Sequence, residues 1–499
     1  MSDPWAAVGL SRDMVVDGAL AHWQEFRRGV SAEEGNHRFR NWLFGELAAD
    51  STEHDHSFGL FEIAIGIAGR GLVDDAFLVL GWLAERYAGH PDPDLAWRVI
   101  MGLTDDCMHL TYESPKHNSV AQRVLREVVD RADTSGSVEV ERATCRALVQ
   151  IATLRSIAGE RRAGIAEIWT EVVRRWEGSA DLGLRGRVAQ ALVNLALLAL
   201  QFDDEPAARR AFAEVVLRFG DAPSGLDGEL DRWVAVARNG DRMLDRIAFA
   251  EPEFQLGYLR RQQHWYPETD IDGVVEMARL VHTRSAGAVR SWACTGQPFV
   301  LLLRNFAMTE RSGVTTAKFM LSGREPADHV KVISYRYANS VLQELDANVP
   351  LVQVASTTAG DLEVDPMKMS FVVSNRLYLP GATWFQTVST LITVATRIIV
   401  WTDELTQALS MELNELIRQG RTDDTVVLLE PHRFDAPVQV VLPRYAGEVL
   451  TTDHPVLAPF PNRVDCTPLK GGRVADCPEL VRLARHLDEV TRQPVGPRL

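Results

Sequence analysis

Apolar residues in the N-terminal half of the chain recur with a helical period, and the whole pattern then repeats. Leu125, Trp169 and Phe212 head three copies of it, so the period is 43 to 44 residues. The copies are Leu125-x-x-Val128-Val129-x-x-Ala132, Trp169-x-x-Val172-Val173-x-x-Trp176 and Phe212-x-x-Val215-Val216-x-x-Phe219. With the apolar residue four positions earlier, each copy forms one stripe of an α-helix. The pattern predicts three equivalent amphipathic helices.

A second apolar segment repeats between these copies. Residues 147–152, Ala-Leu-Val-Gln-Ile-Ala, match residues 191–196, Ala-Leu-Val-Asn-Leu-Ala. Each repeat therefore holds two helices, and antiparallel helix pairs that stack side by side make an α-solenoid. We predict an all-α repeat domain over residues 1–222, with core packing as the role of its repeat aromatics.

The segment from Ala191 to Asp221 resembles the tetratricopeptide repeat, because small residues stand where that family packs helix against helix. The resemblance covers about residues 60–222. It departs in its longer period, since the standard unit has about 34 residues, and in lacking the Gly-x-x-Tyr signature. It implies a surface for an unknown protein or small-molecule ligand.

The pattern changes after residue 295. Four short, continuous apolar runs are typical of buried parallel strands: 299–303, 351–354, 398–401 and 426–429. Helical segments separate them at 338–347, 384–395 and 405–419. Alternating strands and helices predict a parallel sheet with helices on both faces, whose ligands bind beyond the carboxyl ends of the strands.

These patterns divide the rest of the chain as well. Residues 223–294 stay helical in pattern but lose the repeat, so we expect a helical linker or cap. The α/β domain is expected over 295–430. The acidic, Pro-rich stretch 431–475 reads as an irregular appendage, closed by a final helix at 478–491, within a last segment of 431–499.

One carboxylate in the helix at 405–419 lies among apolar residues. At 100° per residue, Glu412 falls inside the apolar arc that runs from Ala408 through Leu405 to Leu413, whereas Glu415 falls outside it. Ionised carboxylates are rarely buried without a partner. Glu412 is therefore a candidate functional residue, and Glu415 is expected on the outer face.

The strand at 398–401 followed by a helix carrying Glu412-Leu413 is similar to the third strand and catalytic-glutamate helix of TIR domains. Ala408-Leu409 stand where that family commonly has Trp-Cys. Arg304-Asn305-Phe306, after the first strand, is similar to the Arg-Ser-Phe signature of bacterial TIR-like domains. The resemblance implies a flavodoxin-like fold over about 130 residues.

Many enzymatic TIR domains cleave the nicotinamide–ribose bond of NAD+, often in bacterial antiviral defence, after self-association. The resemblance thus implies NAD+ or a related nucleotide as substrate, no further cofactor, and Glu412 as the catalytic residue. Arg304 would bind a phosphate through its fork of donors. Phe306 would stack on a base, and Trp401 would wall the pocket.

Two alternatives remain open. In the first, Glu412 is a helix-face residue paired with Arg304 or Arg397, and Phe306 belongs to the core. In the second, the chain is not an enzyme, and its repeat and TIR-like domains both serve protein–protein interaction, as in signalling adaptors. The loss of the Trp-Cys pair favours this second alternative.

Composition excludes several other classes. The net charge is −15, which argues against a protein that coats duplex nucleic acid. The five cysteines form no C-x-x-C pair, and the group Glu53-His54-Asp55-His56 reads as a solvated interhelix loop, so no metal site is expected. The sequence contains no P-loop, G-x-G-x-x-G or G-x-S-x-G motif.

The N-terminal residues and the longest apolar run indicate where in the cell the protein is expected. The first 13 residues lack the basic and apolar regions of a secretion signal. The longest apolar run, residues 192–200, is about half the length needed to cross a bilayer. We therefore expect a cytoplasmic protein without a membrane partner.

Overall fold

The structure of the chain is a computed structural model that falls into two compact units. It describes residues 12–45, 52–113, 115–132, 136–158, 162–222, 228–247, 249–254, 270–304, 350–356, 375–402, 404–429, 448–465 and 481. One unit comprises Met1–Leu195 with Arg218–Trp233, and the other comprises Ala196–Leu217 with Val234–Leu499. Each is described by itself.

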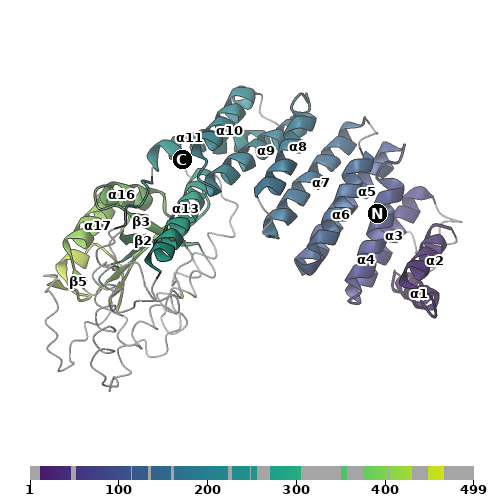
Figure 1. The fold of residues 1–499 in the computed structure, drawn as a ribbon, viewed down its shortest axis with the longest axis horizontal. Helices are drawn as coiled ribbons and strands as arrows, with labels where there is room; N and C mark the ends of the chain where they lie inside the picture. The colour runs from purple at the N-terminus through teal and green to yellow at the C-terminus, as the bar shows by residue number, and fades with distance from the viewer. Residues whose placement is uncertain are drawn as a thin grey trace, which may run out of the picture. The chain divides into compact units, whose positions relative to one another are not determined.

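The first unit is built from helices (Figure 1). They are α1 (Arg12–Phe26), α2 (Ala32–Gly45), α3 (Glu53–Gly69), α4 (Val73–Tyr87), α5 (Pro93–Glu113), α6 (Asn118–Ala132), α7 (Val138–Ile157) and α8 (Arg162–Trp176). A 3-10 turn, η2 (Pro115–His117), precedes α6. Three further helices cross the division between the units: α9 (Leu182–Gln201), α10 (Glu205–Phe219) and α11 (Glu229–Arg246).

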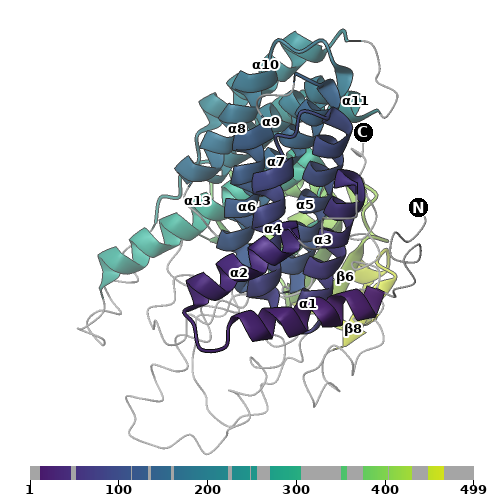
Figure 2. The same ribbon diagram turned by 90° about the vertical axis from the view of Figure 1, so that its right-hand side faces the viewer.

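The helices of the first unit pack as a stack of hairpins (Figure 2). Consecutive helices pair as α3 with α4, α5 with α6 and α7 with α8. Several helices also contact the one two places along the chain, as α4 does α6 and α5 does α7. This neighbour pattern is that of an α-solenoid. Within the described residues of 120–220 the structure has no strand, as the repeat pattern predicted.

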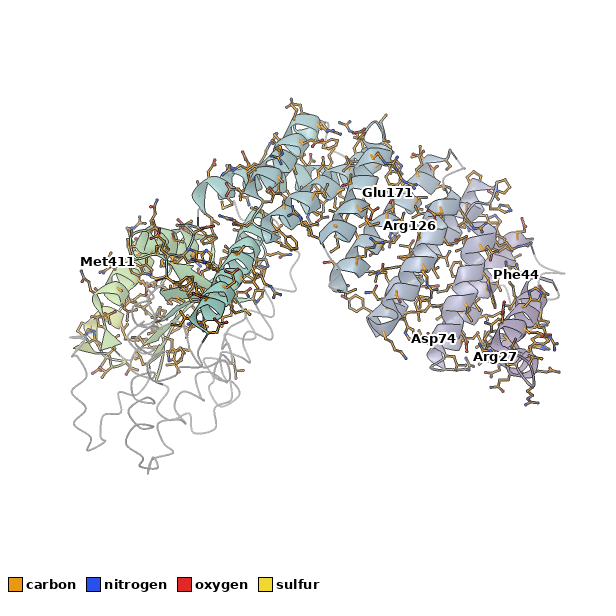
Figure 3. All side chains as sticks on the ribbon, viewed as in Figure 1. Arg27, Phe44, Asp74, Arg126, Glu171 and Met411 are labelled. Carbon is orange, nitrogen blue, oxygen red and sulfur yellow. The ribbon has the colours of Figure 1, made fainter. Side chains whose placement is uncertain are left out.

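The repeat stripes form the core of this stack. Leu125 in α6, Trp169 in α8 and Phe212 in α10 are all buried, at 0%, 7% and 0% exposure. On the polar side, Arg126 of α6 donates to Glu171 of α8 at 3.0 Å (Figure 3). The equivalent helices α6 and α8 of successive repeats therefore lie next to each other within the first unit. Burial confirms core packing for Trp169 in the first unit and for Phe212 in the second.

Two helices bear on local predictions, α3 at its first turn and α9 in its apolar length. Residues Glu53 to His56 are the first turn of α3 and not a loop, because Thr52 caps that helix by accepting from Asp55 N–H. Helix α9 is long and apolar enough to cross a membrane by length and composition. However, 56% of its most apolar 18-residue stretch is buried inside the protein, as in a core helix.

The second unit contains a six-stranded, wholly parallel sheet. Its strands are β1 (Val300–Arg304), β2 (Leu351–Ser356), β3 (Asn375–Leu379), β4 (Arg397–Thr402), β6 (Thr425–Leu429) and β8 (Asn462–Asp465). They lie in the order β3-β2-β1-β4-β6-β8. The four predicted strands are confirmed as β1, β2, β4 and β6. A separate two-stranded sheet pairs β5 (Glu404–Leu405) with β7 (Glu448–Val449) antiparallel, and a 3-10 turn, η4 (Pro455–Leu457), precedes β8.

Helices cover both faces of the sheet. Helices α16 (Trp384–Val394) and α17 (Gln407–Arg418) share one hydrophobic core with alternate strand residues such as Leu303, Val354 and Val400. On the other face, α13 (Ile271–Thr295) packs on Ala355 and Tyr378. Successive strand residues point to opposite faces, so the sheet separates α17 from this second surface.

Two predictions about the strands of the second unit were wrong. Strand β3 was missed, and β8 lies in the stretch expected to be an irregular appendage, where it pairs with β6. The strands after residue 290 are not all parallel, because β5 and β7 run antiparallel. The division between units falls inside α9, α10 and α11, and residues 196–217 and 234–294 belong to the same unit as the sheet.

The sheet order also departs from the expected flavodoxin-like fold, whose order is 2-1-3-4-5. Counted along the chain, the six strands follow 3-2-1-4-5-6, the other common doubly wound order. The reason is the missed strand β3, which adds to the sheet outside β2. The strand before α17 is consequently the fourth and not the third. The expected helices at 338–347 and 478–491 lie outside the described residues, apart from residue 481.

Candidate functional site

The chain reverses its direction across the sheet between β1 and β4. From β1 it proceeds to β2 and β3 on one side, and from β4 to β6 and β8 on the other. In open α/β sheets, ligands bind in the crevice outside the carboxyl ends of the strands at such a switch point. This edge of β1 and β4 is therefore the candidate binding edge of the domain.

Two of the predicted residues meet there. Arg304 is the last residue of β1, and its register partner in β4 is Trp401. Trp401 was expected just past a strand, but it lies inside β4 and is only 1% exposed. Since Ile398 and Val400 face the core shared with α16 and α17, Trp401 faces the opposite side of the sheet. Phe306 lies outside the described residues.

Glu412 is buried in the middle of α17. The helix begins after Thr406, whose hydroxyl accepts from Leu409 N–H at 3.2 Å, and it packs Leu409, Leu413 and Leu416 against the sheet. Glu412 shares that face and is 2% exposed, as the helical pattern predicted. Its carboxyl group has no hydrogen bond or ion pair with any described residue. The expected alternative partner, Arg397, pairs with Asp424 instead.

Burial controls the charge of Glu412. Removal from water raises the pKa of this carboxyl to about 8, because a low-dielectric surrounding disfavours the charged form. At neutral pH the group is therefore mostly a neutral acid. A cation brought close to it would favour the ionised form and lower its pKa. Glu412 can thus respond to a positively charged ligand.

Glu415, expected on the outer face, is instead buried between α17 and α16, at 6% exposure. It accepts from Ser389 Oγ of α16 at 2.5 Å, from Arg418 Nε at 2.6 Å and from Gln419 Nε2 at 2.7 Å. The bonds from Arg418 come first among the causes that lower the pKa of Glu415 to about 2. The helical pattern missed this residue because one of its partners, Ser389, lies on another helix.

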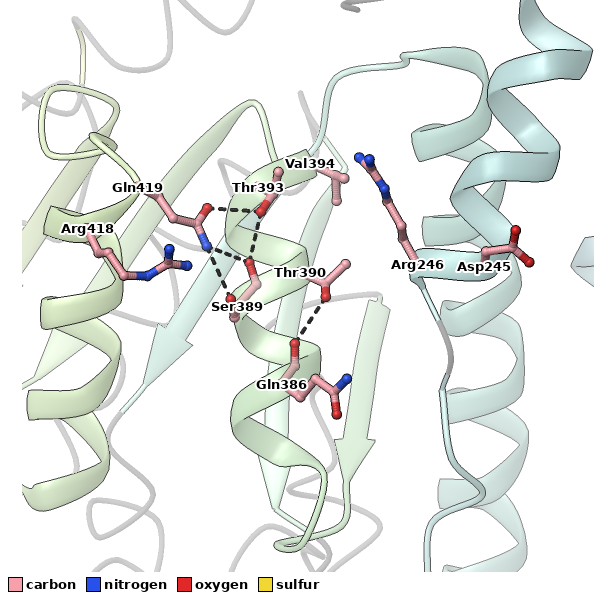
Figure 4. Close-up of a pocket in the computed structure, with 9 residues that line it drawn as sticks. All are labelled: Asp245, Arg246, Gln386, Ser389, Thr390, Thr393, Val394, Arg418 and Gln419. Carbon is pink, nitrogen blue, oxygen red and sulfur yellow. Dashed lines mark hydrogen bonds between the residues drawn. The ribbon is translucent and has the colours of Figure 1, made fainter.

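A polar pocket of about 620 Å³ lies between the end of α11 and the outer sides of α16 and α17 (Figure 4). Its lining residues are Asp245, Arg246, Gln386, Ser389, Thr390, Thr393, Val394, Arg418 and Gln419. Thr390 and Thr393 donate to carbonyls one turn back along α16, at 3.1 Å each. The pocket contains none of the predicted residues and is distinct from the switch point.

The described residues contain no group of three or more His, Cys, Asp or Glu that could hold a metal ion. In the group at the start of α3, His54 binds Asp92 at 3.3 Å, and His56 is buried between Tyr87 Oη and the Leu43 carbonyl, at 2.7 and 2.8 Å. These side chains serve different contacts. Arg304 ends β1 at the switch point, so the backbone places a cationic residue at the edge where a phosphate would bind.

No protein-family model, curated protein or solved structure matches the chain.

Proposed function

We propose that the chain is a cytoplasmic sensor–effector protein, in which the helical repeats bind a ligand and the TIR-like α/β domain cleaves NAD+ on self-association. The observation that carries the proposal is Glu412, a buried carboxyl without a partner among the described residues, on the helix that follows β4. Burying a polar group costs free energy unless it is hydrogen-bonded, so a function at this position would explain why the carboxyl is there. A role in bacterial antiviral defence follows from the TIR resemblance alone.

The sheet offers a second line of support. The switch point lies between β1 and β4, and dinucleotides bind at this position in doubly wound folds. If β3 is counted as an added edge strand, the remaining five follow the order 2-1-3-4-5, which is the flavodoxin-like order of the proposed family. Arg304 ends β1 at this edge and is the proposed phosphate-binding residue, whereas Trp401 is buried on the face of the sheet opposite α17.

The proposed reaction matches the chemistry of one carboxyl. The bond between ribose C1′ and the nicotinamide nitrogen breaks, and its electron pair neutralises the pyridinium ring. Water adds to C1′ and releases a proton, giving ADP-ribose and nicotinamide. The ribose develops positive charge in the transition state. An ionised Glu412 would stabilise that charge more than it stabilises the ground state.

The charge state of Glu412 fits a cationic substrate. The free carboxyl holds its proton at neutral pH because burial raises its pKa to about 8. The nicotinamide ring of NAD+ is a cation, and its approach favours the carboxylate. On this proposal, the substrate itself produces the form of Glu412 that the reaction needs, and the site stays neutral in its absence.

The test is incubation of the purified full-length chain with NAD+ over a range of protein concentrations, with and without a crowding agent. Free nicotinamide is measured by chromatography. We expect its release to rise more steeply than in proportion to protein concentration, because self-association completes the site. Absence of nicotinamide under all of these conditions would overturn the enzymatic proposal.

A second candidate function is supported by the depth of Glu412. At 2% exposure the carboxyl is closed off from solvent in the single chain, which suits a purely structural helix face. The chain would then be a non-enzymatic scaffold that uses its repeat and TIR-like domains for protein–protein interaction. Concentration-dependent self-association without nicotinamide release would favour this function.

A further inference from the structure

Helix α13 contacts the last helices of the repeat array at one end and the sheet at the other. It is a continuous helix of 25 residues, Ile271–Thr295, and all of the contacts below lie within the second unit. Figure 1 shows it as the teal helix between α11 and β2. Its C-cap Gly296, with φ of 71°, leads into β1 within four residues.

The C-terminal half of α13 is fixed to the repeat helices by a partly buried ion pair. Arg290 is a buried residue that donates to Asp203 Oδ1 at 2.9 Å, just after α9, and lies 3.7 Å from Glu205. Asp203 has a φ of 59°, in the left-handed region that few residues other than glycine adopt. The backbone thus has an uncommon conformation at the residue that binds Arg290 of α13.

Close backbone packing adds to this attachment. A Cβ on Gly287 would lie 2.9 Å from the Cα of Gln201, closer than packed carbon atoms come, so α13 crosses the end of α9 with no space between them. Asn239 of α11 donates to the carbonyls of Ala293 and Cys294 at 3.2 and 2.9 Å. These bonds satisfy carbonyls that the end of a helix leaves open.

The middle of α13 is bonded to the edge strand of the sheet. Ser285 Oγ accepts from Arg376 N–H at 2.8 Å, and His282 Nδ1 accepts from Tyr378 N–H at 3.1 Å. β3 is the edge strand and has β2 on one side only. The amides of Arg376 and Tyr378 bond to α13, so they are on the open side of the strand. The side chains of α13 therefore take the place of a neighbouring strand.

We propose that α13 is the mechanical link by which a change at the end of the repeat array reaches β3 and, through β2 and β1, the switch point. A rigid helix held at both ends cannot shift at Gly287 without disturbing the bonds at Ser285 and His282, less than two turns away. The link joins the repeats, the proposed sensor, to the α/β domain, the proposed effector, and this inference therefore rests on the proposed function. Its test does not depend on NAD+ cleavage.

The experiment is amide hydrogen exchange of the full-length chain, read at residues 375–379. Asp203→Asn suits it because Asn tolerates the left-handed conformation, so the change removes mainly the charge that faces Arg290. We expect exchange at Arg376 and Tyr378 to become about tenfold faster, since local opening sets the exchange rate. Gly287→Ala, which pushes the helices apart, should have the same effect at the same amides.

Two controls decide the outcome. Asp245→Asn removes an equivalent carboxylate of α11, which pairs with Arg209 at 2.8 Å and is 69% exposed, and it should leave β3 unchanged. Ser285→Ala removes the acceptor of Arg376 N–H directly and should speed its exchange. If Asp203→Asn and Gly287→Ala speed exchange only in α9 to α13, with β3 as slow as in the wild type, the link does not exist. Equal acceleration by Asp245→Asn would likewise reject it.

Discussion

Arg304 and Trp401 are register partners at the carboxyl ends of β1 and β4, the two strands at which the chain reverses across the sheet. They are about 100 residues apart in sequence and become neighbours only because β4 joins the sheet beside β1. The backbone thereby brings a cationic residue to the edge where doubly wound folds bind phosphate-bearing ligands.

A substitution of Arg304 tests whether this edge binds a nucleotide. Arg304→Gln should weaken NAD+ binding by roughly 10- to 100-fold, because a hydrogen bond to a charged group contributes about 1.5–3 kcal/mol. Isothermal titration calorimetry on the full chain measures the change. The matched control is Arg279→Gln on α13, which is 56% exposed and far from the edge in sequence. If both variants bind as the wild type does, Arg304 is not a ligand contact.

Glu412→Gln should remove NAD+ cleavage with little change in shape. The amide keeps the size of the side chain but carries no charge toward the developing oxocarbenium ion, so we expect the rate of nicotinamide release to fall on the order of 10²–10³. Asn414→Asp, an exposed change of charge on the same helix, serves as the control and should retain the rate. Glu412→Gln activity equal to that of the wild type would remove the catalytic assignment.

The same substitution makes a prediction about stability. Burial raises the pKa of Glu412 to about 8 in the folded chain, from an ordinary value of 4.5. Below pH 4.5 both states are protonated. As the pH rises toward 8, the unfolded chain loses its proton and the folded chain keeps it, so stability falls in that window. Glu412→Gln lacks this loss. Its thermal midpoint should therefore gain on the wild type between pH 5 and pH 8, and a constant difference would show that Glu412 is not buried as a neutral acid.

Glu415 should contribute to stability and not to chemistry. Glu415→Gln weakens the bonds that Ser389 and Arg418 make to the carboxylate, at 2.5 and 2.6 Å, and should lower the free energy of unfolding by about 1–3 kcal/mol. Glu276→Gln, 78% exposed on α13, should change it little. Combining Glu415→Gln with Ser389→Ala should give less than the sum of the two effects, because the residues share one bond. Strict additivity would mean that this bond contributes nothing.

Acid should release α13 from β3. Burial, and then the nearby charge of Arg290, lower the pKa of His282 to about 4 from its ordinary value of 6.5. Above pH 6.5 the neutral ring accepts from Tyr378 N–H in the folded state. As the pH falls from 6.5 toward 4, the unfolded chain binds a proton that the folded chain cannot, so stability declines. A His282→Asn variant should lose this decline in thermal midpoint between pH 7 and pH 4.5; an unchanged profile would assign the decline to other groups.

The sequence predicted the elements whose pattern depends on local spacing. Leu125, Trp169 and Phe212 mark equivalent helices because a helical stripe repeats every 3.6 residues wherever it lies in the fold. The runs at β1, β2, β4 and β6 were recognisable because a strand buried on both faces is apolar throughout. The burial of Glu412 followed from the same helical geometry.

Features that depend on a partner far along the chain could not be predicted. Strand β3, Asn-Arg-Leu-Tyr-Leu, has too few apolar residues for a buried run, and its open side is completed by Ser285 and His282 of α13. Glu415 looked solvent-exposed because its partner Ser389 is on another helix. Strand order is likewise set by long-range pairing, so the fourth strand was mistaken for the third.

The cover that α13 gives β3 also limits how the sheet can grow. An open strand edge is a template on which another chain can add a strand. At β3 the outward amides of Arg376 and Tyr378 are already occupied by Ser285 and His282, so an incoming strand would first have to displace a helix. Strand addition by a second copy is therefore directed away from β3, the edge strand that α13 covers.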